Sequence, residues 1–239
     1  MCASFRSPSS TALSRSPVGG ERGSAVSRAG QVALRMYEEV CRATGESGRE
    51  AFNCLVRIWA DIVRIRPLQE KDRPAADRVI PLMPDLVRAI EDEGFFDPLG
   101  EVFAVNGLGA KDQILTPEPI VRFIVEQTVG KAAEEPRRQP VRVLDPCTGT
   151  GRFLIVTARL YAPALGPRLH LYGVELDLEL YRACLVNMRL ASFSLPYRIL
   201  YGDALMLDLG ADSPNWAFAN RWDPPDWRKL KFSRFSQTK

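Results

Sequence analysis

A glycine-rich stretch in the second half of the chain has the residue types of a ligand-binding loop. It begins at Asp145 and reads Asp-Pro-Cys-Thr-Gly-Thr-Gly-Arg-Phe-Leu, between an apolar run typical of a strand and a segment typical of a helix. Glycines at such a turn let backbone N–H groups approach a ligand at the open edge of a parallel sheet. A purely structural turn has the same short Gly-x-Gly pattern, so both interpretations stay open on the glycines alone.

Acidic side chains stand at the ends of the predicted strands in the same half. Asp145 follows the first strand, Glu175 the second and Asp203 the third. A carboxylate at the carboxyl end of a strand can accept hydrogen bonds from both hydroxyls of a ribose. Each acid alone is more often a cap or a turn residue, but their order favours a binding site.

Alternating strands and helices position these residues. Apolar patterns predict strands over 141–144, 170–174 and 197–200, a short fourth strand over 216–219, and helices over 152–161 and 178–191. This alternation predicts an α/β fold with a partial Rossmann-like sheet preceded by a helical region.

The part of the chain before the sheet is predicted to be helical. Residues 31–66 carry apolar side chains at three- and four-residue spacing, and 85–93 form another short candidate. Asp97-Pro98 and Thr116-Pro117 are typical helix starts, the second followed by a stripe of Ile120, Val121, Ile124, Val125 and Val129. We therefore divide the chain into a disordered tail (1–30), a helical region (31–112), a ligand-binding domain (113–227) and a basic tail (228–239).

Composition excludes several classes of protein. The 239 residues are 46% hydrophobic with a formal net charge of +3, which is ordinary for a globular chain, and no apolar stretch is long enough for a membrane span. Five cysteines without a Cys-x-x-Cys pair and a single histidine predict no metal site. The same cysteines, with no secretory segment before them, fit reduced thiols in the cytoplasm.

The loop and its neighbours resemble the N6-adenine DNA methyltransferases, in particular the modification subunits of type I restriction systems. The family loop is close to Asp-Pro-Ala-Cys-Gly-Thr-Gly-Gly-Phe-Leu, and this chain has Cys-Thr in place of Ala-Cys and Arg152 in place of the last glycine. The resemblance also covers 113–125, 173–177, 181–190 and 202–205. It implies a class I methyltransferase fold with S-adenosyl-L-methionine as cofactor and DNA as partner.

The resemblance assigns the cofactor residues one by one. Glu175 would bind the ribose, Asp203 the adenine amino group, and the Thr-Pro turn the methionine end. The full set is Thr116, Pro117, Asp145, Thr148, Gly149, Gly151, Phe153, Glu175, Leu176, Asp203 and Ala204.

The catalytic motif matches less well. The family has Asn/Asp-Pro-Pro-aromatic after the fourth strand, where the first side chain holds the adenine amine and the ring stacks on a flipped base. Here Asp223, Pro224 and Pro225 fit that motif, but Asp226 stands at the aromatic position and Trp227 follows one residue later. A proline-rich surface loop with packed tryptophans is the other interpretation.

The expected function is therefore methylation of adenine N6 in DNA within a restriction-modification or related system. Only four strands can be placed, so we expect a C-terminally incomplete methyltransferase domain, completed by a second polypeptide. A non-catalytic cofactor- or DNA-binding subunit and a truncated remnant are the alternatives.

Overall fold

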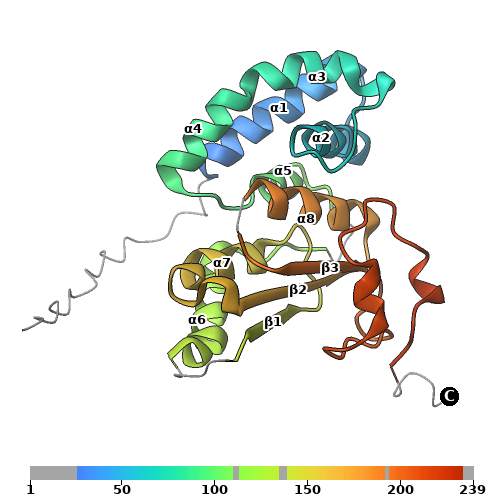
Figure 1. The fold of residues 1–239 in the computed structure, drawn as a ribbon. Coiled ribbons are helices and arrows are strands. Elements are labelled where there is room, and N and C mark those ends of the chain that lie inside the picture. Colours follow the sequence, from blue (N-terminus) through green and yellow to red (C-terminus); the bar gives the residue numbers. More distant parts are fainter. Residues whose placement is uncertain (1–25, 110–112, 135–138, 192–193, 234–239) are drawn as a thin grey trace, which may run out of the picture.

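The computed structural model describes residues 26–109, 113–134, 139–191 and 194–233. The chain forms a group of N-terminal helices and then a three-stranded parallel sheet with helices packed on one face (Figure 1). This is the α/β class that the strand–helix alternation predicts. Residues 1–25 of the expected disordered tail and 234–239 of the expected basic tail lie outside the described residues.

Five helices make up the described residues of the N-terminal part. They are α1 (Arg28–Thr44), α2 (Gly48–Ile62), α3 (Arg73–Val79), α4 (Met83–Glu93) and α5 (Pro98–Val105), with single 3-10 turns at Glu70–Asp72 and Ile80–Leu82. The helical expectation for 31–66 is confirmed, and the segment is divided into the two helices α1 and α2. Gly45 ends α1 in the left-handed conformation, at φ 72°, and its N–H donates to the Cys41 carbonyl, which lets the chain turn back into α2.

The expected helix starts agree with the structure in part. The short helix over 85–93 is confirmed as the body of α4, and Asp97 caps α5 by accepting a hydrogen bond from the Gly100 N–H at 2.8 Å. The next helix, α6, spans Glu118–Glu134 and begins just after Pro117. Its expected buried stripe is only half correct, because Val121, Val125 and Val129 are buried whereas Ile120 and Ile124 are exposed.

The first three predicted strands are confirmed and form one parallel sheet. Strands β1 (Val141–Asp145), β2 (Leu169–Glu175) and β3 (Tyr197–Tyr201) pair in parallel in the order β1-β2-β3, and α7 (Arg152–Leu165) and α8 (Leu178–Leu190) connect them. Asp145 lies beside Gly173 and Glu175 beside Tyr201 in the register. All three strands therefore end at one edge, where the loops to α7 and α8 also begin.

Three hydrophobic clusters hold these parts together. One joins the N-terminal helices to one side of α8, and a second fills the space between the sheet and α6, α7 and α8. The third lies on the opposite face of the sheet, where Val174 and Leu200 pack against Leu207, Trp216 and Trp227. The C-terminal segment thus covers that face without forming a regular helix.

The expected fourth strand over 216–219 is wrong. Residues Pro214–Phe218 form a 3-10 helix, and Ser213 caps it by accepting from the Asn215 N–H. Trp216 packs edge-on against Tyr172 at 5.0 Å between ring centroids, so its apolar neighbours need no strand partner. Among the described residues, no helix is long and apolar enough to cross a membrane.

Candidate cofactor site

The glycine loop between β1 and α7 is anchored to the neighbouring strand. Thr148 is buried, and its N–H donates to the Val174 carbonyl of β2 at 3.0 Å. The Gly151 N–H donates back to the Thr148 carbonyl at 2.8 Å, which closes the turn before α7. Gly173 makes room for this arrangement, since a Cβ at that position would lie 2.3 Å from the Thr148 methyl group.

Glu175 fastens the same loop from the end of β2. One carboxylate oxygen accepts from the Gly149 N–H at 2.7 Å, and the other accepts from the Asp177 N–H at 2.8 Å. Each carboxylate oxygen can accept more than one hydrogen bond, so both keep capacity for a ligand hydroxyl. Glu175 can therefore shape the loop and bind a ligand with the same group.

The loop glycines are required by packing and backbone conformation. Gly149 has φ 54° and Gly151 φ 95°, the left-handed region that side chains disfavour. A Cβ on Gly151 would stand 2.9 Å from the Cys184 Sγ, inside the contact between α7 and α8. The atoms nearest to that Cβ belong to the protein core, so packing by itself requires a glycine at this position.

Negative charge is concentrated at the carboxyl edge of the sheet. Burial raises the pKa of Asp145 to about 6, and the nearby Glu175 charge acts in the same direction. Burial likewise raises the pKa of Glu175, and burial together with Asp145, Glu175 and Asp203 raises the pKa of the Cys147 thiol. Within the described part of the chain, no Lys or Arg forms an ion pair with these three carboxylates.

Apolar surface adjoins these carboxylates. No group of three or more His, Cys, Asp or Glu side chains is placed to hold a metal among the residues that the structure describes. Asp203 accepts from the Leu205 N–H at 2.9 Å, and Ala204 beside it is half-buried. Leu176 and Leu205 are 53% and 88% exposed beside the acids, so apolar surface adjoins the charge.

The Thr116–Pro117 turn is tied to the loop through Arg152. The Thr116 carbonyl accepts from Arg152 Nη1 at 3.0 Å, and Arg152 begins α7 directly after the glycine loop. Leu115 also contacts the loop, since its side chain is 2.9 Å from where a Gly149 Cβ would stand. Phe153, the next residue of α7, is half-buried.

Asp97 is the centre of a buried network that the sequence did not reveal. Its fully buried carboxylate accepts from Thr150 Oγ1 at 2.6 Å, Arg152 Nε at 2.9 Å and Asn187 Nδ2 at 2.7 Å, besides the Gly100 N–H. The sequence identified Asp97 only as a helix cap. Its partners lie 53 to 90 residues away, and no local pattern indicates them.

Arg49 forms a second link that sequence reasoning missed. From α2 it reaches the start of α8, where Nη1 lies 2.9 Å from Asp177 and 3.1 Å from Glu179. Its other donors bind the Leu108 carbonyl at 2.9 Å and the Gln113 side chain at 2.6 Å. The N-terminal helices thus support both segments that flank the loop.

The structure does not bring the expected catalytic motif together with the loop. Asp223 Oδ1 lies 3.1 Å from Arg182 and 3.7 Å from Arg66, and its side chain is 73% exposed. Just before it, Asn220 exchanges backbone and side-chain hydrogen bonds with Ile199 of β3. The sheet order is β1-β2-β3, so this motif lies next to the β3 edge, whereas the glycine loop starts at the end of β1.

Local contacts account for the two prolines of the motif and for the Asp226–Trp227 pair that follows them. Pro224 and Pro225 are half-buried, and Asp226 caps a 3-10 turn at Trp227–Lys229 by accepting from the Arg228 N–H at 3.1 Å. Trp227 is buried in the cluster with Leu207. Its ring therefore belongs to the core of this face, where it is not available to stack on a base.

Comparison with known proteins identifies the domain. The family model described as N-6 DNA Methylase matches residues 98–220, just over half of the chain. No curated protein matches.

Two solved structures are similar over 77% of this chain. One is assigned to the class I S-adenosylmethionine-dependent methyltransferases of Listeria monocytogenes, with 20% identity, a TM-score of 0.49 and 56% of that chain covered. The other is a type I restriction-modification methyltransferase subunit from Streptococcus thermophilus, with 17% identity, a TM-score of 0.41 and 42% covered. The chain thus spans about half the length of the solved structures it matches.

Proposed function

The chain belongs to the N-6 DNA methylase family, and on that premise we propose that it binds S-adenosyl-L-methionine and serves the methylation of adenine N6 in DNA, within a restriction-modification or related system. The observation that carries the cofactor proposal is the set of three carboxylates, Asp145, Glu175 and Asp203, at the loop edge without a cationic partner among the described residues. The cofactor carries a positively charged sulfonium, which such an edge attracts.

The residues present fit the cofactor. Glu175 keeps free acceptor capacity for the ribose hydroxyls, and Asp203 lies beside the apolar surface of Leu205 on which an adenine ring can rest. The Thr116–Pro117 turn, held by Arg152, is the proposed contact for the methionine end. The proposed set also includes Thr148, Gly149, Gly151, Phe153, Leu176 and Ala204.

When bound, the cofactor supplies the methyl group, and the chain's task is to orient the partners. We propose Asp223, within Asp223-Pro224-Pro225, as the acceptor for the adenine amine. In the structure its carboxylate is held by Arg182 and Arg66. A role in methyl transfer therefore requires that carboxylate to leave both guanidinium groups.

A second candidate function is cofactor or DNA binding without catalysis. The position of Asp223 beyond β3 favours it, as does the burial of Trp227. In that case another polypeptide would supply the catalytic motif.

Isothermal titration with S-adenosyl-L-methionine tests the cofactor proposal. Glu175→Gln replaces one acceptor oxygen by an NH2 group, so either the Gly149 or the Asp177 N–H loses its acceptor. We expect the free energy of cofactor binding to weaken by about 1.5–3 kcal/mol, roughly tenfold to a hundredfold in affinity. Glu126→Gln, on the exposed side of α6, removes the same charge and should bind like wild type. Equal affinity in all three proteins would exclude Glu175 as a cofactor residue.

A further inference from the structure

The boundary between α2 and α8 carries four arginines that the cofactor site does not use. Arg64 and Arg66 follow the end of α2, and Arg182 and Arg189 stand on α8. We call these four residues the arginine seam. Arg182 and Arg189 are seven residues apart, so they share one face of the helix and are separated by about 10.5 Å along its axis.

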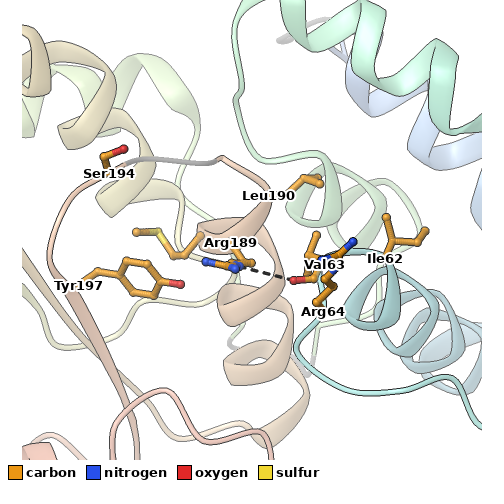
Figure 2. A pocket seen from close by; sticks show the side chains of 8 residues that line it. Ile62, Val63, Arg64, Arg189, Leu190, Ser194 and Tyr197 are labelled. Carbon is orange, nitrogen blue, oxygen red and sulfur yellow. Dashed lines mark hydrogen bonds between the residues drawn. The ribbon is translucent and has the colours of Figure 1, made fainter.

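Separate contacts hold the two ends of the arginine seam at this boundary. Arg189 Nε lies 3.5 Å from the backbone carbonyl that precedes Arg64, as the dashed line in Figure 2 shows. At the other end, the guanidinium carbons of Arg66 and Arg182 lie 5.9 Å and 5.1 Å from the centroid of the Trp222 ring. Stacking on one ring holds both groups in place, and Arg182 also donates to the Trp222 carbonyl at 3.2 Å and to Asp223 at 3.1 Å.

One carboxylate serves this cluster of positive charge. Asp223 reaches Arg182 and Arg66 through the same oxygen, and its side chain is largely exposed. Within the described residues, no ion pair joins Arg64 or Arg189 to an acid. Burial lowers the pKa of Arg182, and the nearby charge of Arg66 acts in the same direction, whereas the charge of Asp223 opposes it.

A cavity of about 470 Å³ opens between the two exposed members of the seam, Arg64 and Arg189 (Figure 2). Tyr197 and Met188 line it from the sheet side, and Ile62 and Val63 from the end of α2. The cavity has room for a phosphodiester group between two guanidinium groups, each of which can donate a pair of hydrogen bonds to phosphate oxygens.

We propose that the arginine seam binds the sugar-phosphate backbone of DNA, and that Asp223 occupies one phosphate position when DNA is absent. The inference rests on the proposed DNA substrate and gives it a location. The separation of about 10.5 Å between Arg182 and Arg189 along α8 is large enough for the two ends of the seam to contact different phosphates of one strand. A carboxylate between two guanidinium groups is the intramolecular equivalent of such a phosphate.

Fluorescence anisotropy of a labelled mixed-sequence duplex, at sodium chloride concentrations from 0.1 to 0.4 M, tests the proposal. Each phosphate contact contributes about 0.9 to the slope of log K against log salt. The double variant Arg64→Gln/Arg189→Gln should therefore have a slope shallower by about 1.8 and bind roughly 50-fold more weakly at 0.1 M salt. Both side chains are exposed, so circular dichroism and the cofactor titration should stay unchanged.

Two more variants sharpen the test. Asp223→Asn removes the competing carboxylate and should tighten DNA binding by several-fold, a direction opposite to that of the arginine variant. Arg88→Gln, an exposed arginine of α4 that faces Asp85, is the matched control and should bind like wild type.

The outcomes separate this proposal from the proposed function. If the double variant binds DNA as tightly as wild type, or if Asp223→Asn binds it more weakly, the role of the seam is refuted. The proposed DNA substrate would stand in either case. Absence of DNA binding by every protein, with normal cofactor binding, would overturn both the DNA substrate and the seam. Failure of cofactor binding, with the expected seam effects, would overturn only the cofactor assignment.

Discussion

Replacing Asp145 by Asn should make the protein more stable and its cofactor binding weaker. Asp145 ends β1 at the carboxyl edge, with a pKa of about 6 against 3.8 for a free side chain, because burial and the Glu175 charge disfavour its ionised form. Between about pH 4 and pH 6 the Asp145 carboxyl is therefore protonated in the folded state and ionised in the unfolded state. The free energy of unfolding falls as pH rises through this range, because the folded state must give up that proton.

The magnitude follows from the shift. Two pKa units correspond to about 3 kcal/mol, and partial solvent access reduces this to about 2 kcal/mol above pH 7. Asn keeps an oxygen that can accept from the Cys147 N–H at the 3.1 Å now seen, so that hydrogen bond need not be lost. We expect Asp145→Asn to raise the free energy of unfolding by about 2 kcal/mol at pH 7.5 and by less than 1 kcal/mol at pH 4.

Urea denaturation at both pH values measures the stability. Isothermal titration measures the affinity for S-adenosyl-L-methionine. That affinity should fall by about tenfold or more at pH 7.5, because a negative charge near the sulfonium is lost. Asp212→Asn, on the exposed surface, controls for the change in net charge. A variant no more stable than wild type at pH 7.5 would refute the buried-charge argument. A stabilised variant with unchanged affinity would show that this carboxylate does not serve the ligand.

Three further predictions concern the loop, the buried network and activity. Gly151→Val should lower the free energy of unfolding by about 2–5 kcal/mol, from left-handed strain and the clash with Cys184, and stability equal to wild type would contradict the packing found here. Asp97→Asn should cost about 3–5 kcal/mol in urea denaturation because it leaves the Arg152 guanidinium buried without its counter-charge, whereas a cost below 1 kcal/mol would mean that the network relaxes freely. In a methyl-transfer assay with tritiated cofactor and mixed-sequence DNA, we expect little or no turnover by this chain, and robust turnover abolished by Asp223→Ala would show that the motif works as it stands.

The elements around the loop could be predicted because their signals are local. Apolar runs ending in an acid predict β1, β2 and β3, and the structure places those ends at one edge. The region from 205 onward could not be predicted in this way. An apolar run around Trp216 is equally typical of a strand and of a turn packed on a sheet, and the contact with Tyr172, 44 positions earlier, decides between them.

The site residues also differ in whether a local signal predicts them. Strand-end acids were identified because each stands at a fixed place relative to its own strand. The roles of Arg49 and Asp97 depend on partners up to 130 residues away, and nothing in their neighbourhoods distinguishes them from an ordinary surface arginine or an ordinary helix cap. Asp223 shows the reverse case, since a short motif predicted one set of partners and the fold supplies another.

These long-range contacts give the N-terminal helices a structural role at the candidate site. Asp97 binds Arg152, the first residue of α7, and Arg152 also donates to the Thr116 carbonyl. Arg49 joins the Gln113 side chain to Asp177 at the start of α8. Each link ends beside the loop or beside Glu175. Because a buried carboxylate and its guanidinium are costly to separate, the helices and the loop edge must form together. The helical region is therefore part of the candidate site's construction, although none of its side chains stands among the proposed cofactor residues.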